Sequence, residues 1–184
     1  ELEGEEGEVA GSDAGGDRMN LELPGMQEEL LKAVTATGKP VVLALLNGSP
    51  VTINWAQDNV PAIIECWYPG QEGGRALAEV VFGDYNPAGR LPVTFVRSLD
   101  QVPPFADYSM AGRTYRYMKE EPLYPFGYGL SYTEFEYSNL SVDMKSLGTA
   151  EKEDLKVTVE VANTGARAGD EVIQLYVEDV EAGV

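Results

Sequence analysis

The spacing of apolar residues predicts alternating helices and strands over residues 20–97. Apolar positions from Met26 to Val34 recur at helical spacing, and Gly38 and Pro40 follow as stop signals. Residues 41–46 and 62–67 are nearly continuous apolar runs, which predict strands buried on both faces. We expect these strands to belong to one sheet.

Further elements of the same kind follow or separate these strands. A short helix is expected around residues 53–58, a second over 71–82 with Gly83 as its cap, and a third strand over 91–96. Because helices and strands alternate, the sequence predicts a partial αβα sandwich with a mostly parallel sheet.

The pattern changes after residue 97. Ten of the seventeen aromatic residues lie between Phe105 and Tyr137, which predicts an ordered, proline-containing connector. Alternation of apolar and polar residues then predicts strands at 155–163 and 173–177, and a further strand is expected at 135–142. A β-sandwich needs about seven strands, so we expect a truncated all-β domain, and we interpret the chain as a piece of a longer protein.

Composition removes several classes of function. The 31 Asp and Glu residues against 13 Lys and Arg give a net charge of −18, which disfavours nucleic acid and anionic membrane surfaces as partners. The chain has no histidine, and Cys66 is its single cysteine, so His-based nucleophile systems, His-ligated metal sites and thiolate clusters are excluded. The longest aliphatic run has six residues, against about 20 for a membrane span. Any chemistry must therefore use carboxylates.

Four features are candidates for a site. The acidic opening could supply a proton donor, although acidic glycine-rich stretches are more often solvated tails. The loop at residues 69–74 could cradle an anion, although helix initiation with Glu72 in the first turn explains it more simply. The aromatic connector could stack on sugars, but packing between domains is the commoner role. Trp67, at the end of a strand, is the better single candidate for a sugar platform.

Five segments carry a family resemblance. They are residues 2–6 (Leu-Glu-Gly-Glu-Glu), 16–18 (Gly-Asp-Arg), 67–74 (Trp-Tyr-Pro-Gly-Gln-Glu-Gly-Gly), 82–92 (Phe-Gly-Asp-Tyr-Asn-Pro-Ala-Gly-Arg-Leu-Pro) and 124–132 (Tyr-Pro-Phe-Gly-Tyr-Gly-Leu-Ser-Tyr). In order and spacing they resemble the C-terminal part of glycoside hydrolase family 3. In that family a barrel supplies a nucleophilic Asp, an α/β sandwich supplies the acid/base Glu, and many members add a fibronectin-type-III-like domain.

The resemblance implies three parts for this chain. Residues 1–97 correspond to the second half of the α/β sandwich domain with its acid/base loop, 98–134 to the connector, and 135–184 to the start of a fibronectin-type-III-like domain. The N-terminal barrel of the same parent chain, with its nucleophile, would be a necessary partner. We therefore expect the 184 residues alone to be inactive.

The resemblance also implies a catalytic residue. The family's loop carries a Gly-Glu pair before an Asp-Arg pair, and here Gly4-Glu5 precedes Asp17-Arg18, so Glu5 is the expected acid/base. Glu6 and Glu3 remain alternatives because the loop varies in length. In an extended segment Glu5 and Glu6 point to opposite sides, so both cannot face the sugar.

The implied activity is retaining, exo-acting hydrolysis of terminal β-linked sugars, and the resemblance implies no cofactor and no metal. The form of residues 2–6 and of residues 112–117 is more like the β-xylosidase branch, which suggests xylo-oligosaccharides as substrates. A β-glucosidase of the same family is the alternative, and a non-catalytic carbohydrate-binding or scaffold module is the alternative from another class. A secreted or periplasmic location is favoured over the cytoplasm, and a homo-oligomer is possible.

Overall fold

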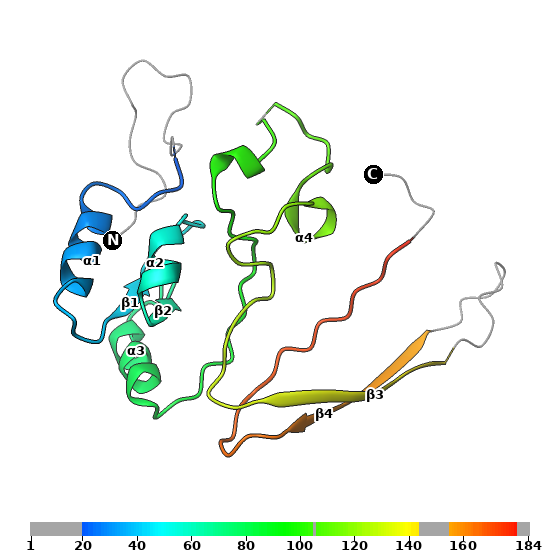
Figure 1. Cartoon of the computed structure of the whole chain (residues 1–184). Helices are drawn as coiled ribbons and strands as arrows, with labels where there is room; N and C mark the ends of the chain where they lie inside the picture. Colours follow the sequence, from blue (N-terminus) through cyan, green and yellow to red (C-terminus); the bar gives the residue numbers. More distant parts are fainter. Residues whose placement is uncertain (1–19, 105, 144–154, 180–184) are drawn as a thin grey trace.

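The computed structural model describes residues 20–104, 106–143 and 155–179. Helices α1 (Gln27–Thr35), α2 (Asn54–Asn59) and α3 (Gly73–Phe82) lie around the strands β1 (Val42–Leu45) and β2 (Ala62–Glu65) (Figure 1). Each element falls within or close to the span that its apolar pattern predicts. The α/β character of this part is therefore confirmed, although the described sheet is small.

Strands β1 and β2 are parallel, as expected, with Val42 opposite Ala62 and Leu45 opposite Glu65. Burial on both faces is not observed, because Val42 is 47% exposed and Ala62 is also exposed. In the part of the chain that the structure describes, only these two strands form the sheet, so neither strand is enclosed by neighbours.

The core lies beside this sheet. It is built from buried apolar side chains of α1, β1, the segment between β1 and α2, α2 with the residue after it, the segment before the connector, and the connector itself. Phe95, Ile53 and Val51 are among its largest fully buried side chains. Burying a side chain of this size contributes about 1.5–3 kcal/mol, so these few residues hold the α/β part together.

The predicted third strand at residues 91–96 is wrong. Leu91 and Phe95 instead exchange backbone hydrogen bonds with the connector: Leu91 N donates to Tyr128 O at 2.8 Å, and Phe95 N donates to Tyr124 O at 2.8 Å. This contact is an antiparallel bridge between Phe95 and Tyr124 and not part of a parallel sheet. Pro92 lacks an N–H group, which interrupts any continuous ladder here.

The connector itself contains two short helical turns, η1 (Leu99–Gln101) and α4 (Thr114–Tyr117). After it, β3 (Phe135–Asp143) and β4 (Lys156–Asn163) form an antiparallel pair, as expected for these two segments. The register shifts between Ser138 and Ser141, where Asn139 adopts a positive φ of 52°. This is the position of a β-bulge.

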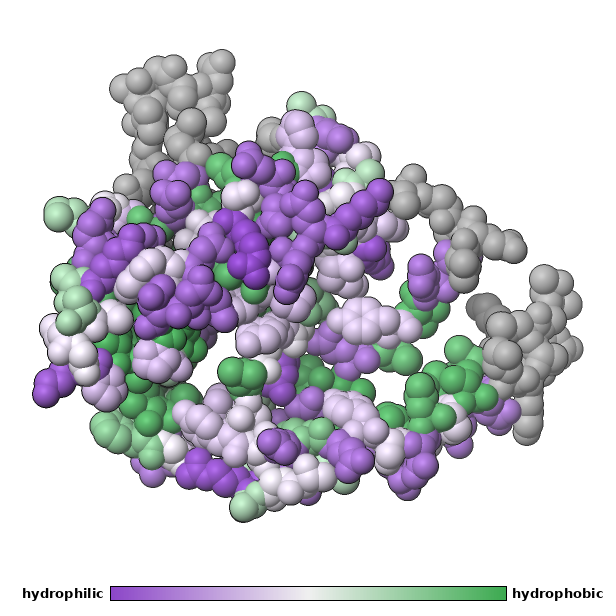
Figure 2. All heavy atoms as spheres, viewed as in Figure 1, coloured by the Kyte–Doolittle hydropathy of each residue, from purple (hydrophilic) through white to green (hydrophobic). Residues whose placement is uncertain are grey.

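The predicted strand at residues 173–177 is not formed. The segment follows an extended path (red-orange in Figure 1) without a ladder to β3 or β4. Ile173, Leu175 and Val177 are exposed. Alternation alone does not make a strand, because a strand needs a neighbour for its backbone groups, and none of the described residues supplies it. Figure 2 shows further exposed apolar residues (green) over the β3–β4 pair.

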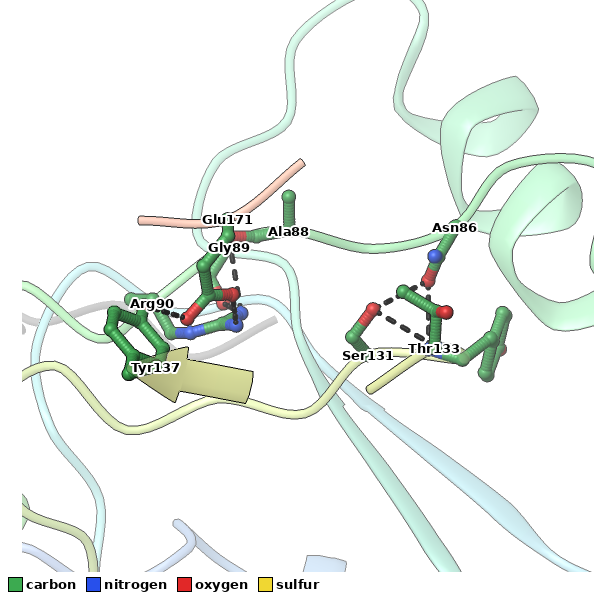
Figure 3. A network of polar contacts seen from close by, with 9 residues as sticks. Asn86, Ala88, Gly89, Arg90, Ser131, Thr133, Tyr137 and Glu171 are labelled. Atoms are coloured by element: carbon green, nitrogen blue, oxygen red, sulfur yellow. Dashed lines mark hydrogen bonds and ion pairs between the residues drawn. The ribbon is translucent and has the colours of Figure 1, made fainter. Parts of the chain in front are cut away.

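A polar network joins the segment after α3 to the β-rich part (Figure 3). Asn86 Oδ1 accepts hydrogen bonds from Ser131 Oγ at 2.9 Å and Tyr132 N at 2.7 Å, and its Nδ2 donates to Ala168 O at 3.0 Å. Arg90 Nη2 lies 2.7 Å from Glu171 Oε2 in an ion pair whose side chains are 12% and 16% exposed. The residues of the 82–92 motif therefore have a structural role between the two parts.

Candidate functional site

The predicted proton donors Glu5, Glu6 and Glu3 lie outside the described residues. Of the site residues that the sequence predicts, the structure describes Trp67. In the described ranges no group of three or more Asp, Glu and Cys residues could hold a metal ion, and no helix is long and apolar enough to cross a membrane.

The carboxyl ends of β1 and β2 meet at one edge of the sheet, because the strands are parallel. Asn47 follows β1, Glu65 is the last residue of β2, and Trp67 comes two residues later. In open α/β sheets this edge is where ligands bind. Asn47, Glu65 and Trp67, which we call the strand-end cluster, are therefore the candidate site within the described residues.

Glu65 is the centre of this cluster. Its Oε1 accepts a hydrogen bond from the backbone N–H of Trp67 at 3.0 Å, and its Oε2 accepts one from Asn47 Nδ2 at 3.2 Å. Burial raises the pKa of Glu65 above its ordinary value, while both hydrogen bonds oppose the rise. The cluster thus contains a carboxyl group whose charged form is disfavoured by desolvation.

Asn47 is 1% exposed and anchors the cluster. Its Nδ2 donates to Ser49 O at 2.8 Å as well as to Glu65, and its buried Oδ1 has no hydrogen-bond partner among the described residues. The amide is fixed by two acceptors from different segments, so its orientation is determined by the fold.

Trp67 has a left-handed backbone conformation, with a φ of 49°. Its ring packs edge-on against Phe95, with the ring centroids 6.0 Å apart and the planes at 71°. The indole therefore belongs partly to the core.

Trp67 also lines a hollow of about 280 Å³ together with Gly48, Pro50, Pro92 and Val93. A Cβ at Gly48 would lie 2.7 Å from the Tyr68 ring, so glycine lets Tyr68 approach this close. The hollow is bounded by apolar surfaces, which suits the apolar face of a sugar ring or another small ligand.

The glycine loop at residues 69–74 starts α3, as the simpler interpretation predicts. Glu72 is the residue before the helix and not part of its first turn, and it makes no side-chain capping bond. A Cβ at Gly73 would lie 2.5 Å from Pro69 Cγ, so only glycine allows this close turn. The expectation for Glu72 needs this correction because α3 begins at Gly73, two residues later than predicted.

Aromatic residues of the connector pack mainly on one another. Tyr124 lies edge-on to Phe95 at 6.1 Å and stacks on Tyr128 at 5.1 Å, and Tyr115 stacks on Phe126 at 4.6 Å. Burial raises the pKa of Tyr124 to about 12, and its hydroxyl donates to the side chain of Gln57. For these rings the geometry agrees with packing more than with sugar stacking.

Sequence reasoning missed Glu65 and Asn47. One signal was available, because Glu65 ends an otherwise apolar strand, where a charge must be satisfied or neutralised. Asn47 gives no such signal, since asparagine before glycine is ordinary in turns. Their contact across 18 residues depends on the pairing of β1 with β2.

Residues 2–132 match the family model described as the glycosyl hydrolase family 3 C-terminal domain. The chain belongs to glycoside hydrolase family 3. Among curated family 3 relatives, a xylan 1,4-beta-xylosidase of Xylanibacter ruminicola is 47% identical over 91% of this chain and 19% of its own length. A periplasmic beta-glucosidase of Salmonella typhimurium is 45% identical over 91% of this chain and 23% of its own length.

Solved structures support the same assignment. The beta-glucosidase of Listeria innocua in complex with glucose superposes with a TM-score of 0.76 at 37% identity, over 91% of this chain and 25% of that one. The beta-glucosidase of Erythrobacter marinus gives a TM-score of 0.73 at 45% identity, over 86% and 21%. The chain spans about a fifth to a quarter of the length of these relatives.

Proposed function

We propose that this chain is part of a retaining, exo-acting β-glycosidase that hydrolyses terminal β-linked sugars, with xylo-oligosaccharides as substrates. The observation that carries the proposal is the match of residues 2–132 to the family 3 C-terminal domain. The relative named xylan 1,4-beta-xylosidase supports the xylosidase branch.

Glu5 is the proposed acid/base. Its support is the spacing of Gly4-Glu5 before Asp17-Arg18, and Glu6 and Glu3 are the alternatives. The nucleophile is a carboxylate of an N-terminal barrel in the same polypeptide. It attacks the anomeric carbon while Glu5 gives its proton to the leaving oxygen, and Glu5 then takes a proton from the water that releases the sugar.

Trp67 is the proposed substrate-binding residue. Its position after β2 and beside the hollow supports this role. A flat indole presents a large apolar surface to the C–H face of a pyranose ring.

A secreted or periplasmic location is proposed as well. Its support is the name of one relative, a periplasmic beta-glucosidase of Salmonella typhimurium.

The test is Glu5→Gln in a polypeptide that contains this chain and the barrel. We expect kcat/KM on substrates with poor leaving groups to fall roughly 10²- to 10⁴-fold, because those need the proton. Glycosylation by an activated aryl glycoside should be largely spared. Added azide should restore turnover and yield a β-glycosyl azide.

Glu6→Gln and Glu3→Gln are the matched controls. If Glu6→Gln shows this behaviour and Glu5→Gln does not, the assignment to Glu5 is wrong. Aryl β-xyloside and aryl β-glucoside tested side by side decide between the two branches. A higher kcat/KM on the glucoside would favour the β-glucosidase alternative, for which the relative from Salmonella typhimurium is the supporting observation.

A further inference from the structure

We propose that Glu65 is a positioning residue that fixes the left-handed backbone conformation of Trp67. In this way Glu65 determines where the indole ring lies beside the hollow. The consequence for sugar binding rests on the proposed role of Trp67. The contact between Glu65 and Trp67 does not depend on that role.

The backbone of Trp67 needs support. A non-glycine residue with φ near +50° is disfavoured by about 1–2 kcal/mol, because its Cβ crowds the neighbouring carbonyl oxygen. The Trp67 N–H donates to Glu65 Oε1 at 3.0 Å across two residues. A hydrogen bond to a charged acceptor is roughly twice as strong as a neutral one, so this contact can offset the strain.

Glu65 is itself held in place from the other strand. Asn47, almost fully buried, donates to Glu65 Oε2 at 3.2 Å and to Ser49 O at 2.8 Å. Asn47, after the end of β1, is therefore connected through the Glu65 carboxylate to the backbone of Trp67. Each carboxylate oxygen has its own donor, so the group cannot rotate without losing one of them.

A purely structural role explains this carboxylate poorly. An apolar side chain at the end of β2 would avoid the desolvation of a charged group. A carboxylate there offers what an apolar residue lacks, an acceptor for the Trp67 N–H. Because Trp67 lines the hollow, a change in the turn would move the surface that a pyranose ring would contact.

The first experiment uses the 184-residue chain. The chain has two tryptophans, so Trp55→Phe leaves Trp67 as the single reporter. In that background Glu65→Ala should change the near-UV circular dichroism and the emission maximum of Trp67. Glu65→Gln should restore most of both signals, because its amide oxygen still accepts the Trp67 N–H, and only the hydrogen bond from Asn47 Nδ2 is lost to the new NH2 group. Glu29→Gln, on the exposed face of α1, is the matched control and should change neither.

Unchanged Trp67 signals in Glu65→Ala would overturn the proposal, and so would equal changes in the Ala and Gln variants. If Glu65→Ala does not fold, Glu65→Asp decides. Its shorter side chain keeps the charge but withdraws the oxygen, so it should alter the Trp67 signals in a folded chain.

The second experiment uses the polypeptide with its barrel. Glu65→Ala should raise KM roughly tenfold with little change in kcat, and Glu65→Gln should recover most of that loss. If the Trp67 signals change but KM does not, Glu65 still positions Trp67 and the sugar-binding role of Trp67 fails. The two proposals therefore fail in distinguishable ways.

Discussion

At the scale of single residues, the pKa of Cys66 is affected by Glu65 of the strand-end cluster. Its Sγ donates to Ile64 O at 3.8 Å, and the side chain is half-buried. Burial raises the pKa of the Cys66 thiol above its ordinary value of 9.0, and the charge of Glu65 raises it further. The thiolate is the reactive form, so a raised pKa makes the thiol less reactive at a given pH.

We therefore expect iodoacetamide to alkylate Cys66 in the native chain with a pH midpoint above the midpoint in the urea-unfolded chain. Because the folded state holds this proton more tightly, the stability that the group contributes is lost as pH rises through the folded pKa. Glu65→Gln should lower the native midpoint towards the unfolded one, whereas Glu29→Gln should leave it unchanged. Equal midpoints in the native and unfolded chains would contradict the structure.

At the scale of elements, α3 shows how two glycines can have opposite effects. Gly83 ends the helix in a left-handed conformation with a φ of 79°, and a Cβ there would lie 3.2 Å from Arg167 Nη2. Gly74 lies within the first turn, where a Cβ would meet nothing within 4 Å. Of the two, only Gly83 has a backbone conformation that requires glycine.

Gly83→Ala should lower the free energy of unfolding by about 1–2 kcal/mol, because alanine is strained at positive φ. Gly74→Ala should raise it by about 0.5–1 kcal/mol, because alanine loses less backbone entropy in a helix. Urea denaturation followed by circular dichroism measures both. A shift of the same sign in the two variants would show that the end of α3 differs from the one described.

At the scale of the whole molecule, the network of Figure 3 links the α/β part to the β-rich part. Arg90 and Glu171 are separated by 81 residues, and Tyr137 of β3 donates to Glu171 Oε1 at 2.7 Å. This hydrogen bond raises the pKa of Tyr137. Because both members of the ion pair are largely shielded from water, removing one leaves the other without its partner.

A double-mutant cycle with Arg90→Ala and Glu171→Ala should give a coupling free energy of about 1–3 kcal/mol in urea denaturation. The exposed pair Arg75–Glu79 within α3 is the control and should give a much smaller coupling, because water screens it. A coupling near zero for Arg90 and Glu171 would mean that the pair does not join the two parts in solution.

The local features of the fold were predictable from nearby residues. The helices α1 and α3 follow from apolar spacing. Gly83 marks the end of α3, whereas α1 ends at Thr35, three residues before Gly38. The two apolar runs predict β1 and β2, and the alternation of helices and strands predicts that they pair in parallel. The family followed from motifs at residues 67–74, 82–92 and 124–132, although the predicted acid/base Glu5 stays a prediction.

The tertiary structure decided which distant groups meet. Residues 91–96 pair with the connector and not with β2, residues 173–177 have no ladder to β3 or β4, and Glu65 receives the N–H of Trp67 and the amide of Asn47. The sequence by itself determined helix spans, strand character and family, because these depend on side chains a few residues apart. Hydrogen-bond partners between segments depend on how the whole chain packs, so only the tertiary structure could assign them.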